Sequence, residues 1–153
     1  MIDHTNLKKE RYVALLAQLR ELLSDETNLI ANMANMSAAL YAEFKFHWVG
    51  FYLVEGDELV LGPFQGPVAC TRIPKGNGVC GKAWEKGETQ IVDNVEEFPG
   101  HIACSPYSKS EIVIPMKKDK KIIGVLDIDS DEYSFFSKED ELYLSAMLFL
   151  LYK

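Results

Sequence analysis

The opening of the chain carries apolar residues at the spacing of an α-helix. Between residues 5 and 23, large apolar side chains recur four, three and four positions apart, at Tyr12, Leu16, Leu19 and Leu23. This spacing places them on one face and predicts an amphipathic helix. A second stripe predicts another helix that ends near Tyr41, and it consists of Leu29, Met33, Met36 and Leu40. Asp25 and Thr27 precede this helix as candidate caps.

After residue 45 the apolar positions follow the pattern of strands. Aromatic and β-branched residues fill positions 46–64 and are interrupted by a Glu-Gly-Asp turn, which predicts a hairpin. A second hairpin is predicted at 112–116 and 121–129, and Ser137 begins a final helix whose first turn is acidic. The elements predicted between the hairpins are strands at 68–73 and 89–93, a short helix at 79–86 and a long loop at 95–110.

The order of these elements predicts the fold class. Hairpins dominate over crossover connections, so we expect an α+β architecture with a mainly antiparallel sheet and helices packed on one face. No repeat or linker divides the sequence, and we therefore expect a single domain over residues 1–153. Its parts are the N-terminal helices (1–41), the sheet with its connecting loops (42–136) and the C-terminal helix (137–153).

Composition narrows the classes of partner. The 153 residues are 48% hydrophobic and 25% charged, as in an ordinary globular domain. Sixteen basic against 23 acidic residues give a net charge of −7, which disfavours nucleic acid and membrane surfaces as partners. We find neither a secretory signal pattern nor an apolar stretch of membrane-spanning length. Three cysteines do not fit a disulfide framework, so these features together predict a protein of the reducing cytoplasm.

A glycine-rich stretch at residues 76–81 has the spacing G-x-G-x-x-G. It follows a predicted strand and opens a predicted helix, which is the context of a dinucleotide-binding fingerprint. The helix is short, however, and hairpins surround the single unit. A turn that leads into a helix is therefore the favoured interpretation.

The three cysteines fall on different predicted elements. Cys70 lies on a strand, Cys80 at the start of the short helix and Cys104 in the long loop. A helix N-terminus or a nearby positive charge lowers the pKa of a thiol, and Arg72 and His101 are the candidate charges. The alternative is three small buried hydrophobic residues, which fits the polar surroundings of Cys104 least well. No Cys-x-x-Cys pair or closely spaced pair of histidines supports a metal site.

Three acidic residues are predicted to approach one another on the second hairpin. Asp127 and Asp129 lie two positions apart on one strand and therefore share a face. Glu111 begins the partner strand and is within reach of both. A solvated sheet face would explain this pattern. A cluster of carboxylates is the functional alternative, in which one group stays protonated near neutrality and the others bind an ammonium group.

Two aromatic residues on the first hairpin share a face in the same way. Trp48 and Tyr52 lie four positions apart, with Gly50 between them. Aromatic core is the usual role of such residues. The alternative is a pocket wall with a small residue at its centre.

Together these stretches resemble one family, the free methionine-R-sulfoxide reductases, which are single GAF-domain proteins. The resemblance extends over essentially the whole chain, and the three cysteines fall at the spacings of 10 and 24 that the family uses. GAF domains at large are mostly ligand-binding modules, and many lack these cysteines. The stretches that carry the resemblance are residues 78–81 (GVCG), 92–95 (VDNV), 98–104 (FPGHIAC), 108–115 (SKSEIVIP) and 124–130 (GVLDIDS).

The resemblance implies a GAF-like fold of about six antiparallel strands and a pocket for free methionine-R-sulfoxide. Cys104 matches the family's nucleophile, Cys70 its resolving cysteine and Cys80 a third cysteine whose role is less settled. Ser105 stands where the family often has Asp. The residues that match the family's substrate-binding carboxylates and pocket aromatics are Glu111, Asp127, Asp129, Trp48 and Tyr52.

The implied chemistry fits these residue types. A carboxylic acid with a raised pKa protonates the sulfoxide oxygen, a thiol attacks the sulfur, and the resulting sulfenic acid condenses with a second thiol to a disulfide. Thioredoxin or another dithiol then restores the enzyme, and no bound cofactor is expected. The rival functions are a non-catalytic GAF sensor for a small ligand or cyclic nucleotide, and a thiol redox sensor. The sequence does not decide whether the chain forms a homodimer.

Overall fold

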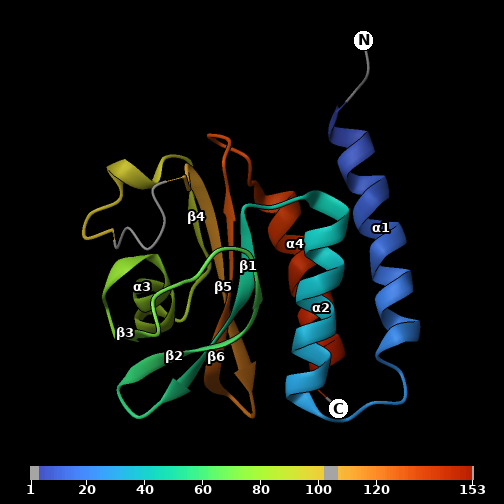
Figure 1. Ribbon diagram of the computed structural model, residues 1–153, viewed down its shortest axis with the longest axis horizontal. Helices are drawn as coiled ribbons and strands as arrows, with labels where there is room; N and C mark the ends of the chain where they lie inside the picture. Colours follow the sequence, from blue (N-terminus) through green and yellow to red (C-terminus); the bar gives the residue numbers. More distant parts are fainter. Residues whose placement is uncertain (1–3, 102–106, 153) are drawn as a thin grey trace.

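The computed structural model describes residues 4–101 and 107–152, which form four α-helices and six strands (Figure 1). The α-helices are α1 (His4–Leu22), α2 (Leu29–Phe44), α3 (Gly78–Lys86) and α4 (Lys138–Leu148). The strands are β1 (Trp48–Glu55), β2 (Glu58–Gln65), β3 (Arg72–Pro74), β4 (Gln90–Val92), β5 (Ser110–Lys118) and β6 (Lys121–Ser130). Two 3-10 turns, η1 (Val95–Glu97) and η2 (Phe149–Leu151), complete the described elements. Within these residues, no helix is long and apolar enough to span a bilayer.

The strands form one antiparallel sheet in the order β3-β2-β1-β6-β5-β4. Both predicted hairpins are present as β1–β2 and β5–β6, and the pairing of β1 with β6 joins them at the centre of the sheet. The α+β class predicted from the sequence is therefore confirmed.

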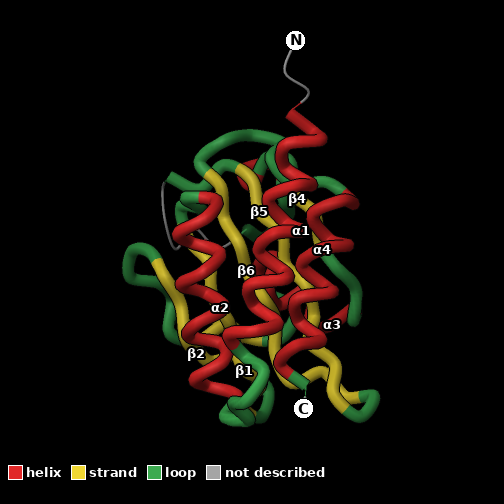
Figure 2. The backbone as a smooth tube through the Cα atoms, turned by 90° about the vertical axis from the view of Figure 1, so that its right-hand side faces the viewer, coloured by secondary structure: helices red, strands yellow, loops and turns green. Residues whose placement is uncertain are grey.

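Helices cover the two faces of this sheet unequally. Helices α2 and α4 lie against one face, and α1 packs on these two helices on the side away from the sheet (Figure 1); Figure 2 views this stack from the α1 side. Apolar side chains of these three long helices meet β1, β5 and β6 in a large buried cluster. The short helix α3 packs on the opposite face against β5 and β6, over a smaller cluster. The second face is therefore only partly covered by a helix, and connecting segments enclose the remainder.

Two local predictions are corrected by the structure. Asn28 caps α2, because its side-chain Oδ1 accepts a hydrogen bond from the backbone N–H of Ala31 at 2.9 Å, whereas Asp25 and Thr27 do not. The helix continues past Tyr41 to Phe44 and ends where Lys45 adopts a left-handed conformation with φ of 56°.

The strand predicted at 68–73 is shorter and later, since β3 contains only Arg72–Pro74. Its expected first half is irregular, and the carbonyls there accept hydrogen bonds from side chains. Trp48 Nε1 donates to the carbonyl of Pro67 at 3.1 Å, and the Tyr52 hydroxyl donates to that of Cys70 at 2.8 Å. These side chains satisfy backbone groups that a strand would pair with its neighbour.

Candidate functional site

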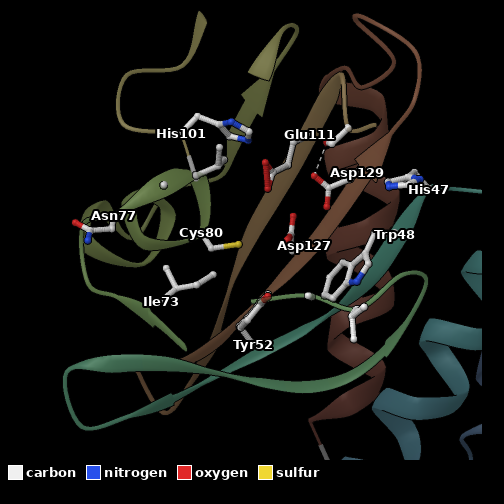
Figure 3. Close-up of a pocket in the computed structure, with 15 residues that line it drawn as sticks. His47, Trp48, Tyr52, Ile73, Asn77, Cys80, His101, Glu111, Asp127 and Asp129 are labelled. Carbon is white, nitrogen blue, oxygen red and sulfur yellow. Dashed lines mark hydrogen bonds between the residues drawn. The ribbon is translucent and has the colours of Figure 1, made fainter. Parts of the chain in front are cut away.

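A pocket lies on the α3 face of the sheet, above the central strands (Figure 3). Strands β1, β6 and β5 form its floor, and the N-terminal turn of α3 forms one wall. Residues from five separate segments line it, among them His47, Asn77, Gly78, His101 and Ser108. The pocket therefore depends on the complete fold and on no single motif.

The strand register brings the three predicted carboxylates together. On β6, Asp129 lies opposite Glu111 of β5, and Gly50 of β1 lies opposite Asp127. Since side chains directly opposite each other share a face, Glu111, Asp127 and Asp129 all point into the pocket. Figure 3 shows them as a row facing Cys80. The solvated sheet face that the sequence left open is therefore excluded.

Burial changes the acidity of these carboxyl groups. Glu111 and Asp127 are only 5% and 6% exposed. Burial raises the pKa of Glu111 well above its ordinary value, and the charges of Asp127 and Asp129 raise it further. Burial likewise raises the pKa of Asp127 to about 6. For Asp129, burial and the charge of Asp127 raise the pKa, against a hydrogen bond from the Ser108 hydroxyl at 2.9 Å.

One oxygen of the carboxylate cluster has no hydrogen-bond donor among the described residues. Asp127 Oδ1 is buried and accepts no hydrogen bond from any of them. A buried carboxylate oxygen without a partner is unfavourable. The arrangement therefore combines carboxyl groups of raised pKa with a buried oxygen that an external donor, such as an ammonium group, would satisfy.

Cys80 is a free, buried thiol at the N-terminal turn of α3. Its sulfur and one oxygen each of Glu111 and Asp127 lie within 4.8 Å of one another, a spacing that would let these three residues share a metal ion. Burial raises the pKa of Cys80 well above its ordinary value, and the neighbouring carboxylate charges raise it further. Of the two interpretations that the sequence left open for Cys80, an activated thiol and a small buried residue, burial and the negative charges favour the second.

The other predicted thiols differ from Cys80. Cys70 is half-buried and disulfide-bonded. Cys104 and Ser105 lie outside the described residues. Of the two candidate positive charges, Arg72 pairs with Glu58 at 3.4 Å, and burial lowers the pKa of His101. Neither supplies a fixed positive charge inside the pocket.

An aromatic wall stands beside the carboxylates. The ring of Trp48 stacks on Phe64 with centroids 5.2 Å apart, and on Tyr52 with centroids 5.9 Å apart. A methyl group added at Gly50 would lie 2.8 Å from the Trp48 ring and closer still to the Cβ of Phe64. Gly50 is therefore required by the packing of these rings. The sequence left open whether Trp48 and Tyr52 belong to the core or to a pocket wall, and both are buried residues that line the pocket. The stacking of Phe64 and the hydrogen bond from Ser108 were not predicted, because both depend on tertiary packing.

The glycine-rich stretch 76–81 is a turn, as favoured. Gly76 and Gly78 adopt positive φ values of 83° and 63°, and a methyl group at Gly81 would lie 2.8 Å from the carbonyl of Pro74. Strands β3 and β4, which flank this unit, lie at opposite edges of an antiparallel sheet. A dinucleotide fingerprint needs a parallel βαβ unit, so that alternative is excluded.

Comparisons with known proteins agree on one family. A family model described as GAF domain matches residues 29–151. Free methionine-R-sulfoxide reductase of Escherichia coli (strain K12) is 48% identical over 147 residues, covering 95% of this chain and 89% of that protein. GAF domain-containing protein A of Dictyostelium discoideum is 60% identical over 145 residues, covering 94% and 92%.

Among solved structures, free methionine-R-sulfoxide reductase from Neisseria meningitidis in complex with its substrate superposes with a TM-score of 0.92. It is 51% identical to this chain, and the match covers 94% of this chain and 87% of that one.

Proposed function

Because this chain belongs to the GAF-domain family, and within it to the free methionine-R-sulfoxide reductases, we propose that it reduces free L-methionine-(R)-S-oxide to L-methionine. The observation that carries the proposal is the row of three carboxyl groups, of which Glu111 and Asp127 are buried, beside an aromatic wall and a thiol-bearing helix. Such a site offers a proton, an ammonium-binding group and an apolar surface within one pocket.

Substrate recognition divides between charge and apolar contact. The ammonium group of the substrate pairs with the ionised members of the cluster and satisfies the unpartnered Oδ1 of Asp127. Its sulfur and methyl group pack against Trp48 and Tyr52, since sulfur–aromatic contacts are favourable. A peptide amide in place of the ammonium would leave a buried carboxylate unpaired. Sites that hydrogen-bond a particular group of the substrate select against an analogue without that group by about 10⁴-fold. The proposed substrate is therefore the free amino acid.

The reaction begins with protonation. Burial raises the pKa of Glu111 well above its ordinary value, so we assign it as the acid that donates a proton to the sulfoxide oxygen. The sulfur atom of Cys104 then attacks the sulfoxide sulfur. The thiol proton returns to the carboxyl group of Glu111, and the S–O bond of the sulfoxide breaks as its oxygen passes to the cysteine. Cys104 becomes a sulfenic acid, and the sulfoxide, reduced by two electrons, leaves as methionine.

A disulfide completes the cycle. The thiol of Cys70 condenses with the sulfenic acid of Cys104, releases water and forms a disulfide. Thioredoxin or another dithiol reduces it and takes the two oxidising equivalents. The bonded state of Cys70 and the free, buried state of Cys80 support this division between the two cysteines. A dithiol reductant is available in the reducing cytoplasm, which we therefore propose as the site of action. We also propose that residues 1–153 act as one domain.

The test is release of methionine from four substrates: the R and S epimers, each free and peptide-bound, with thioredoxin as the reductant. We expect turnover of the free R epimer alone. Cys104→Ser should abolish turnover, and Cys70→Ser should allow one turnover per enzyme but block recycling by thioredoxin. Absence of methionine release by the unaltered protein would favour a sensor, and normal recycling in Cys70→Ser would move the resolving role to Cys80.

A further inference from the structure

Residues 65–71, which we name the Cys70 segment, comprise the last residue of β2 and the irregular connection from β2 to the edge strand β3. Residues 65–68 are all exposed, and the side chain of Val68 is 89% exposed. No other large hydrophobic side chain among those described is as exposed. Cys70, two residues away, is half-buried, whereas Cys80 is only 4% exposed. Of these two cysteines, Cys70 is therefore the more accessible to an external reductant.

Hydrogen bonds fix the backbone on both sides of the exposed residue Val68. On one side of Val68, the indole of Trp48 holds the carbonyl of Pro67, and on the other the Tyr52 hydroxyl holds that of Cys70. The carbonyl of Thr71 accepts a further hydrogen bond from the backbone N–H of Leu61 at 2.9 Å. A segment fixed before binding loses little conformational entropy when a partner contacts it. The pocket aromatics therefore have a second role, since they present the Cys70 segment to solvent.

Charge also distinguishes this segment. The chain has a net charge of −7, yet residues 59–71 include no charged side chain, and the next residue is Arg72. Protein dithiols attack disulfides as thiolates, which are anions. On the outer side of the segment, a thiolate therefore meets less electrostatic repulsion than over the acidic surface that the net charge implies. On the inner side, Val68 and Ala69 line the pocket that holds the three carboxyl groups.

We propose that the Cys70 segment is the docking surface for the dithiol protein that recycles this enzyme, with Val68 as the central apolar contact. The inference rests on the proposed function, in which the enzyme disulfide is reduced once in every turnover. One thiolate of the partner attacks Sγ of Cys70, forms a mixed disulfide and releases the other sulfur of the enzyme disulfide, which takes up a proton. The second thiol of the partner then attacks the mixed disulfide, which returns Cys70 to the thiol and leaves the partner oxidised.

The experiment compares two reductants at saturating substrate. Thioredoxin, regenerated by its reductase, must dock on the protein surface, whereas dithiothreitol is a small dithiol without such a surface. The readout is kcat/KM for thioredoxin divided by the rate constant supported by dithiothreitol, so that any effect on the chemical steps cancels. We expect Val68→Ala to lower this ratio about tenfold, as for a central interface residue. Val68→Glu should lower it further by adding a buried negative charge.

Three other variants make the test specific. Gln65→Glu and Thr71→Glu each add a charge to an exposed position of the Cys70 segment, and each should lower the ratio. Val13→Glu places the same charge on α1, at a position that is 52% exposed on the opposite side of the sheet, and should leave the ratio unchanged. A ratio within twofold of the unaltered protein for both Val68 variants would overturn the docking surface. Loss of turnover with dithiothreitol in the unaltered protein would instead refute the proposed function.

Discussion

Asp127→Asn is expected to make the protein more stable at neutral pH while impairing its activity. Asp127 is almost fully buried, and the structure supplies no hydrogen-bond partner for its Oδ1 among the described residues. Its pKa rises from 3.8 to about 6 in the folded protein because burial disfavours the charged form. The folded state therefore holds the proton of Asp127 more tightly than the unfolded state.

The direction of the pH dependence follows from this difference. Below pH 3.8 the carboxyl group is protonated in both states and has no effect on relative stability. As pH rises from 3.8 to about 6, the unfolded chain releases the proton first, and the folded protein loses stability. Above pH 6 the loss is complete, and at 1.36 kcal/mol for each pH unit it amounts to about 3 kcal/mol. An asparagine does not ionise, so the variant should avoid this loss.

The measurement is urea denaturation without substrate at intervals from pH 4 to pH 8. The free energy of unfolding of Asp127→Asn should match that of the unaltered protein near pH 4 and exceed it by about 3 kcal/mol at pH 8. Asp131→Asn, which changes an exposed carboxyl group, is the control and should show no such divergence. Parallel pH curves for Asp127→Asn and the unaltered protein would show that burial does not raise the pKa of Asp127. The same variant should show a raised KM for the sulfoxide, because the ammonium loses a charged partner.

Three other substitutions separate proton donation, pocket shape and folding. Glu111→Gln removes the proposed proton donor and should lower kcat about 10²- to 10⁴-fold in a methionine-release assay, while Glu97→Gln, at an exposed position, should not. Gly50→Ala forces a methyl group against Phe64. It should lower the free energy of unfolding, measured in urea, by about 1–3 kcal/mol and should raise KM for the sulfoxide. An unchanged KM would mean that the rings shift without affecting the pocket. Tyr12→Phe removes a 2.6 Å hydrogen bond to the buried Asp140 and should lower stability by about 1–2 kcal/mol without changing kcat/KM. Impaired activity at equal fold content would link α1 to the site.

The sequence predicted those parts of the site that depend on strand alternation. Asp127 and Asp129 lie two residues apart on a strand, so their common face followed from the pleat alone. Glu111 required only that the two strands form a hairpin, and the observed register places it opposite Asp129. The acidic cluster could therefore be predicted from local pattern and one correct pairing.

Properties that depend on tertiary packing were less predictable. The helix-start position of Cys80 suggested an activated thiol, but α3 packs onto the sheet and buries that thiol beside three carboxyl groups, which reverses the direction of its pKa. The strand expected at 68–73 was shortened because side chains of Trp48 and Tyr52 hold the carbonyls of this segment. In both cases the deciding contacts come from residues more than fifteen positions away, which periodicity does not report.

Alternation along the three central strands also explains how a small domain accommodates an unfavourable acidic cluster. On β1, Val49 and Phe51 enter the large apolar cluster beneath the long helices, while Trp48, Gly50 and Tyr52 face the pocket. Strands β5 and β6 repeat the division, with Ile112, Ile114, Leu126 and Ile128 on the helix side and all three carboxyl groups on the other. The apolar face provides the larger buried cluster, which offsets the unfavourable burial of the acids. A shift of one residue in the β1–β6 register would exchange the two faces and place aspartates under the helices. The strongly apolar helix face therefore fixes the register on which the geometry of the pocket depends.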